Sequence, residues 1–258
     1  MTPGEGISAA IRASNARGRP ALVGYLTAGF PSRRRFKESL AAVAAECDVV
    51  EIGVPFSDPM ADGTTVQRAS FAALADGTTL PWILSELESI APRHAAPILL
   101  MSYLNPLLSL GLADLPRRAA AAGVAGFIVP DLPFEESADL HQALAGEGLA
   151  LVQMVTPVTP AARLAMLCRE AKGFVYAVTM TGTTGKSADV PDDVLDYMDR
   201  VKRCSSVPVC AGFGIRSSVQ VKRFAPHVDG VVVGSALVEV LEKGGDVAAF
   251  LRSLRQRS

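Results

Sequence analysis

Cysteine and histidine are scarce in this sequence of 258 residues, and neither type is clustered. These residues are Cys47, Cys168, Cys204 and Cys210, and His94, His141 and His227. No two cysteines form a CxxC pair, and the spacing of the whole set matches no common metal-ligand pattern. We therefore expect no metal site, and we interpret most of the cysteines as small core residues.

An excess of charge and a long apolar run are also missing. The chain has 25 Lys and Arg against 26 Asp and Glu, so the composition indicates no basic surface for a nucleic-acid backbone. No stretch reaches the roughly 18 apolar residues of a membrane span, and the N-terminus lacks the basic and apolar regions of a signal peptide. We expect a cytoplasmic protein that binds neither nucleic acid nor membrane.

Apolar residues are abundant, at 49 % of the chain. A chain of this length buries roughly 70–75 % of the surface that it exposes when unfolded, so a sizeable core is expected. Short apolar runs rich in β-branched residues predict eight strands. The runs begin near Ala21, Asp48, Pro97, Gly126, Ala150, Phe174, Val207 and Asp229.

Between these runs, apolar residues at three- and four-residue spacing predict amphipathic helices. The helical patterns cover Arg35 to Ala45, Leu115 to Ala122, Glu136 to Glu147, Pro160 to Ala171, Val190 to Arg203 and Ser217 to Phe224. Buried strands that alternate with helices favour a parallel sheet with right-handed crossovers. Eight such units predict an α/β fold, a closed (β/α)₈ TIM barrel that forms a single domain over residues 1–258 with an extra N-terminal helix at Gly6 to Ser14. The alternative, an open doubly wound sheet, lacks the expected GxGxxG turn after the first strand.

A carboxylate, Glu51, interrupts the second apolar run, DVVEIG. A buried acid costs several kcal/mol unless it is paired or protonated. Because the loops at the carboxyl ends of barrel strands form the active site, we interpret Glu51 as a catalytic acid or base. The alternative is an inward-facing acid that a neighbouring donor satisfies. The loop that follows adds Asp58 and Asp62, each of which a simple turn would also explain.

Glycine-rich segments occur in three later loops, at residues 181–185, 212–214 and 234–235. In barrels of this kind, the loops after strands 7 and 8 bind phosphate with backbone N–H groups at a helix N-terminus. Lys and Arg are absent from residues 232–238, which agrees with such a site. The predicted substrate is a phosphorylated small molecule. Only Lys172 adjoins a predicted strand, and it lies at the amino end, so no lysine is placed to form an imine. Because no metal-ligand cluster is present either, proton transfer by carboxylates remains as the chemistry.

The run EIGVPFSDPMADG at residues 51–63 closely resembles the signature of the tryptophan synthase alpha subunit family. Supporting segments are YLTAGFP at 25–31, MSYLNP at 101–106 and DLPFEE at 131–136. The family cleaves indole-3-glycerol phosphate to indole and glyceraldehyde 3-phosphate in tryptophan biosynthesis. The resemblance therefore implies a carbon–carbon lyase that works by a retro-aldol step.

The resemblance also implies residue roles. Glu51 would be the general acid/base that protonates C3 of the indole ring and takes the glyceryl hydroxyl proton, and Asp62 would accept a hydrogen bond from the ring N–H. We expect burial to raise the pKa of Glu51 relative to that of Asp62. The other implied residues are Gly185, Gly214, Gly234 and Ser235 for the phosphate, Tyr25, Leu100, Tyr103 and Tyr176 for the indole pocket, and Thr184 for a lid that closes over Asp62.

A partner follows from the same resemblance. In this family a beta subunit carries pyridoxal phosphate and receives indole within an α2β2 heterotetramer, so no cofactor is expected in this chain. The Asp58-Pro59 segment and the loop Asn105 to Leu112 would face that partner.

Two residues depart from the family pattern. Thr64 stands where proline is usual, and Thr183 stands where valine or isoleucine is usual. These departures leave open an altered lid closure and a free-standing lyase that releases indole without a partner. A barrel that binds a phosphorylated ligand without catalysis is another alternative. A phosphosugar isomerase generally needs an acid or thiol near the end of the first strand, which residues 21–27 do not supply.

Overall fold

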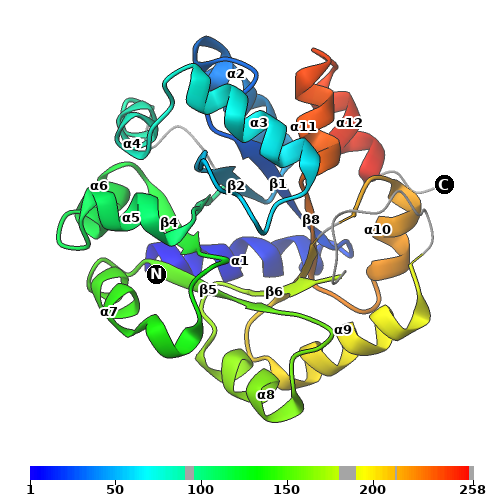
Figure 1. The fold of residues 1–258 in the computed structure, drawn as a ribbon. Coiled ribbons are helices and arrows are strands. Elements are labelled where there is room, and N and C mark those ends of the chain that lie inside the picture. The colour runs from blue at the N-terminus through cyan, green and yellow to red at the C-terminus, as the bar shows by residue number, and fades with distance from the viewer. Residues whose placement is uncertain (91–95, 180–189, 213, 256–258) are drawn as a thin grey trace.

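The computed structural model of the chain describes residues 1–90, 96–179, 190–212 and 214–255. Eight parallel strands close into a barrel in chain order, and helices surround it (Figure 1). The strands are β1 (Ala21–Thr27), β2 (Val49–Gly53), β3 (Ile98–Met101), β4 (Val124–Ile128), β5 (Ala150–Val155), β6 (Val175–Val178), β7 (Val209–Gly212) and β8 (Gly230–Val233). The predicted (β/α)₈ barrel is confirmed, and the open sheet is excluded.

The α-helices follow the strands, and two short 3₁₀ helices lie in the loops at Arg33–Arg35 and Phe134–Glu136. The α-helices are α1 (Pro3–Ala16), α2 (Phe36–Glu46), α3 (Thr64–Ala75), α4 (Leu80–Glu88), α5 (Leu104–Leu110), α6 (Leu115–Ala121), α7 (Ala138–Gly146), α8 (Ala161–Glu170), α9 (Asp192–Cys204), α10 (Ser218–Phe224), α11 (Ser235–Glu242) and α12 (Val247–Leu254). In the described part of the chain, no helix has the length and apolar character needed to cross a membrane.

The six helical patterns read from the sequence correspond to α2 and α6 to α10, with ends displaced by one or two residues. The sequence did not predict α3, α4, α5, α11 and α12. One expectation was wrong: most of the segment Asn105 to Leu112, taken as a loop, belongs to helix α5. Proline at 106 is compatible with this helix because it lies in the first turn, where backbone N–H groups have no intrahelical acceptor.

The extra N-terminal helix α1 closes one end of the barrel. Thr2 and Glu5 form a capping box at its start. Its backbone at Gly4 donates to the Gly148 carbonyl at 2.9 Å, and Gly148 lies just before β5. Ile7 and Ile11 are fully buried and pack against the apolar side chains of the barrel interior. In Figure 1, α1 lies across the middle of the ring formed by the strands. Its hydrogen bonds to the carbonyls of Gly148 and Gly173, which precede β5 and β6, place it at the amino ends of the strands.

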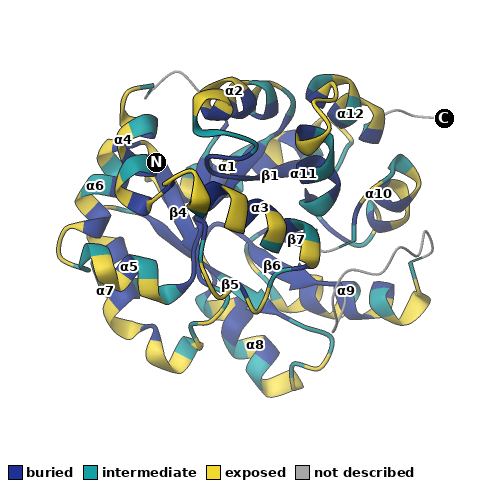
Figure 2. Ribbon diagram, turned by 45° about the horizontal axis from the view of Figure 1, so that its top comes forward, coloured by how far each residue is buried: buried dark blue, intermediate teal, exposed yellow. Residues whose placement is uncertain are grey.

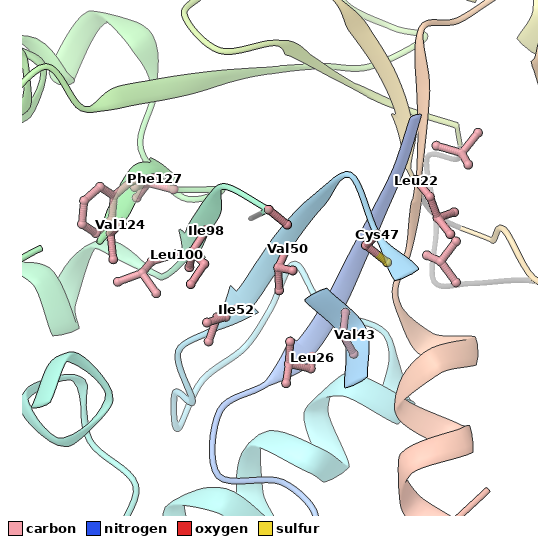
Figure 3. Packing of buried hydrophobic residues seen from close by; sticks show 14 of the residues in the cluster. Leu22, Leu26, Val43, Cys47, Val50, Ile52, Ile98, Leu100, Val124 and Phe127 are labelled. Carbon is pink, nitrogen blue, oxygen red and sulfur yellow. The ribbon is translucent and has the colours of Figure 1, made fainter. Parts of the chain in front are cut away.

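Alternation along the strands separates two apolar layers. Glu51 pairs in register with Tyr25 of β1 and Leu99 of β3, both of which belong to the interior cluster. The next residues, such as Leu26 and Ile52, face the surrounding helices (Figure 3). The strands are thus buried on both faces, and exposed residues are confined to helices and loops (Figure 2). This register places the Glu51 carboxyl inside the barrel.

Candidate active site

A cavity opens at the carboxyl ends of the strands, and it brings together seven of the residues that the sequence singled out. They come from four strands or their following loops and from the start of α11. They are Tyr25, Glu51, Asp62, Tyr176, Gly214, Gly234 and Ser235.

Glu51 lies deep in this cavity, with only 1 % of the residue exposed. Its Oε2 atom is buried and has no hydrogen-bond partner among the described residues. Burial, with a smaller contribution from the charge of Asp62, raises the pKa of Glu51 to about 8. The carboxyl therefore carries a proton at neutral pH and is able to donate it.

Asp62 lies in the loop after β2 and is held by Tyr103. The Tyr103 hydroxyl donates to Asp62 Oδ2 at 3.2 Å and accepts from the Ala61 backbone N–H at 2.8 Å. The Tyr103 ring stacks on Phe56 with 5.0 Å between centroids. Burial raises the pKa of Asp62 to about 6, while the Tyr103 hydrogen bond favours the charged form. Asp62 is therefore mostly ionised at neutral pH, and the order of the two pKa values agrees with the sequence-based expectation.

Helix α3 fixes the loop that carries Asp62. The buried Ser70 accepts a hydrogen bond from the Phe56 backbone N–H at 2.9 Å. Gln67 donates through Nε2 to the carbonyls of Asp62 at 3.0 Å and Pro59 at 3.3 Å. Because these anchors come from one helix, the position of the Asp62 backbone depends on where α3 begins.

Two glycines at strand ends make room for the tyrosines of the cavity. A Cβ atom at Gly53 would lie 2.1 Å from the Tyr25 hydroxyl, and one at Gly212 would lie 2.3 Å from the Tyr176 hydroxyl. Side chains at these positions would displace the rings. Glycine at a strand end can indicate that a large side chain of the neighbouring strand fills the space beside it. Gly53 and Gly212 were therefore available in the sequence as indications of this packing.

The opposite part of the cavity has the features of an anion site. Gly234 is the N-cap of α11, so the first backbone N–H groups of this helix point toward the cavity. Gly214 adopts a φ of +83°, and its carbonyl accepts a hydrogen bond from Gln220 Nε2 at 3.0 Å. Sequence reasoning missed Arg216, which also lines this part of the cavity. Its place two residues after Gly214 was the available signal.

Leu100 does not line the cavity, so this assignment was wrong. Leu100 pairs with Ile52 and Phe127 and lies in the layer between strands and helices (Figure 3). Its neighbour Met101 faces the cavity in its place, because successive strand residues point to opposite faces.

The remaining predicted residues are one that lies next to the cavity and three whose positions the structure does not describe. Tyr103 touches Asp62 and is not among the residues that line the cavity. Gly185, Thr184 and Thr183 lie outside the described residues.

A buried pair of carboxyls beside a helix N-terminus, at the carboxyl end of the strands, defines a (β/α)₈-barrel enzyme suited to acid–base chemistry. The sequence model of the family described as tryptophan synthase alpha chain matches residues 11–255. The chain belongs to this family, and the resemblance seen in its sequence is confirmed. It is therefore a lyase of tryptophan biosynthesis.

Individual relatives agree with this assignment over nearly the whole chain. The tryptophan synthase alpha chain of Nitratidesulfovibrio vulgaris (strain DP4) is 45 % identical over 248 residues, which are 96 % of each chain. A structure of tryptophan synthase from M. tuberculosis in an aminoacrylate-bound form matches with a TM-score of 0.87 and 33 % identity over 98 % of each chain. A structure of the tryptophan synthase α2β2 complex from Pyrococcus furiosus matches with a TM-score of 0.85 and 34 % identity, covering 91 % of this chain and 97 % of that one. None of these relatives is described as a free-standing lyase.

Proposed function

We propose that Glu51 and Asp62 of this chain together cleave indole-3-glycerol phosphate into indole and glyceraldehyde 3-phosphate. The observation that carries the proposal is the buried Glu51 carboxyl, whose pKa of about 8 keeps it protonated in a cavity shared with Asp62. A protonated acid beside an ionised one is the arrangement that this reaction needs.

The Glu51 proton moves to C3 of the indole ring, which leaves a positive charge on the ring and its nitrogen. The Asp62 carboxylate accepts a hydrogen bond from the ring N–H and stabilises that charge. The Glu51 carboxylate then takes the proton of the adjacent glyceryl hydroxyl. As the aldehyde forms, the bond between C3 and the glyceryl carbon breaks, and its electron pair returns to the ring. Glu51 ends protonated, so the cycle closes without a co-reactant.

The phosphate of the substrate is proposed to bind at the N-terminus of α11. The proposed donors are the backbone N–H groups of Gly234 and Ser235, together with that of Gly214 in the same part of the cavity, and they do not require a cation. Gly185 and the lid residue Thr184 belong to the proposal as predictions from the sequence.

A beta subunit that carries pyridoxal phosphate is the proposed partner, in an α2β2 assembly like that of the Pyrococcus furiosus relative. The side chain of Met60, beside the Asp58-Pro59 segment, is 88 % exposed, and that of Leu108 on α5 is 49 % exposed. These exposed apolar residues, one beside Asp58-Pro59 and one within Asn105 to Leu112, support the partner surface that the family resemblance implies. The absence of a cofactor or metal in this chain and its cytoplasmic location belong to the same proposal.

The test is the release of indole from indole-3-glycerol phosphate, measured with and without a beta subunit. Glu51→Gln cannot exchange the proton, so we expect turnover to fall about 10²–10⁴-fold while substrate binding stays similar. Glu38→Gln, which changes an exposed glutamate of α2, is the control for loss of an acid elsewhere. Wild-type turnover in the Glu51 variant would show that another group performs the proton transfer.

A further inference from the structure

Arg216 is the only cationic side chain among the described residues that line the active-site cavity. It shares this cavity with Ser235 and Gly214, at the end where the phosphate is proposed to bind. Its guanidinium contacts Glu239 Oε2 through one nitrogen, at 2.5 Å. A guanidinium has five N–H donors, so this ion pair uses only part of its capacity.

The backbone of Arg216 is fixed to the same loop that presents Gly214. The Arg216 N–H donates to Gln220 Oε1 at 2.8 Å, and Gln220 Nε2 donates to the Gly214 carbonyl at 3.0 Å. Gln220 is itself buried, and Ser217 caps helix α10 directly after Arg216. One buried amide thus holds both residues in a defined relation.

Glu239 lies on α11 one turn after Ser235, on the wall of the same cavity. Its hydrogen bond with Arg216 lowers the pKa of Glu239, so the carboxylate is charged. A lone negative charge here would repel a phosphate, but the paired guanidinium offsets it. The Thr65 hydroxyl also donates to Glu239 Oε1, at 3.5 Å.

We propose that Arg216 is a phosphate-binding residue of this enzyme and that Glu239 positions its guanidinium, leaving the remaining N–H donors for the phosphate oxygens of the substrate. This inference rests on the proposed function, because it assumes that the phosphate occupies the start of α11. Arg216 would add a cationic side chain to a phosphate site whose other donors are backbone N–H groups. The pair selects a phosphorylated ligand over its unphosphorylated analogue.

The experiment measures binding of glycerol 3-phosphate by calorimetry, together with kcat and KM for indole-3-glycerol phosphate. For Arg216→Gln we expect Kd and KM to rise about tenfold, because one charge-assisted contact at a partly exposed site is lost. We expect kcat to change little, since the residue contacts the part of the substrate that does not react. Arg216→Lys keeps the charge and is expected to recover most of the affinity.

Arg68→Gln is the matched control. Arg68 pairs with Glu242 on the same helix α11, with both N···O distances at 2.8 Å, but it does not line the cavity. We expect wild-type affinity for glycerol 3-phosphate in this variant. Equal affinity of wild type and Arg216→Gln, an equal loss in Arg68→Gln, or no binding by the wild type would each overturn the inference. If glycerol 3-phosphate binds in an Arg216-dependent way but no indole forms, the proposed function fails and this inference stands.

Discussion

Glu51 and Asp62 are carboxyls of one cavity with different surroundings. No group among the described residues donates a hydrogen bond to the buried Oε2 of Glu51, whereas Asp62 accepts one from Tyr103. Because the two groups interact, the protons leave the pair in two steps, one near pH 6 and one near pH 8. In the proposed mechanism, the active form is the one with a single proton, held by Glu51.

The pH dependence of kcat/KM should therefore be bell-shaped. We expect the rate to rise as Asp62 ionises near pH 6 and to fall as Glu51 loses its proton near pH 8. The phosphate of the substrate also titrates near pH 6, so a variant is needed to assign the acid limb. Tyr103→Phe removes a donor to the Asp62 carboxylate and should move that limb to higher pH. An acid limb that stays in place would assign it to the substrate.

Glu51 also lowers the stability of the fold as pH rises. Its pKa is about 8 in the folded chain against 4.5 for an unperturbed glutamate, so the folded state binds more protons between these values. Stability is therefore lost as pH increases through this window, and Glu51→Gln removes the loss. The variant should gain on the order of 3 kcal/mol relative to wild type between pH 5 and pH 8. Urea unfolding at pH 5 and pH 8 measures this difference in the free energy of unfolding. If the difference between variant and wild type were the same at both pH values, burial would not be what raises the pKa of Glu51.

Some of the site residues could be predicted from the sequence, and others could not. Glu51 was predictable because a charge inside an apolar strand is conspicuous. Leu100 was assigned to the pocket from the family resemblance, and the strand pattern could not correct this, because strands buried on both faces are continuously apolar. Arg216 was missed because its partner Glu239 lies 23 residues away in the chain and only the fold brings them together.

At the scale of elements, the strands were predictable and part of the helices were not. Helix α3 buries Val66, Ala69, Ser70 and Ala73, and this face lacks the large apolar residues that mark an amphipathic helix. Yet this helix holds the loop that carries Asp62 through Ser70 and Gln67. Its small buried residues follow from close packing beside the barrel, which no local pattern reports.

The start of α3 offers a test of the departure at Thr64. Thr64 is the first residue of the helix, and Gly63 before it has φ −73° and ψ 160°, which is compatible with a following proline. Thr64→Pro should therefore stabilise the protein by about 0.4–1 kcal/mol, because the ring restricts the unfolded chain. Thermal unfolding measures this, and Thr64→Ala separates the effect of the ring from the loss of the threonine side chain. A lower Tm for the proline variant would mean that the loop after Asp62 requires a different backbone.

At the scale of the whole molecule, Asp48 connects the two terminal segments to the barrel. Its side chain is 8 % exposed and pairs with Arg17 after α1 at 3.1 Å and with Arg255 after α12 at 2.8 Å. It also accepts a hydrogen bond from the Leu22 backbone N–H at 2.9 Å. The contact with Arg255 joins residues 207 positions apart, and the set supports the proposal that residues 1–258 form a single domain.

Removing this charge should weaken the entire fold. We expect Asp48→Asn to lower the free energy of unfolding by about 2 kcal/mol, since charge-assisted hydrogen bonds of a nearly buried group are lost. Asp114→Asn, which breaks the exposed pair with Arg117, is the control and should change little. Denaturant unfolding followed by two probes tests both points. Separate transitions for the termini and the barrel would contradict a single domain.

Helix α1 covers the amino ends of the strands, with Ile7 and Ile11 fully buried against the barrel interior. Substrate entry and product release are therefore restricted to the carboxyl ends of the strands. The substrate enters and both products leave on that side. A product that dissociates slowly therefore delays binding of the next substrate molecule. When a product leaves more slowly than the bond breaks, its release sets the turnover rate.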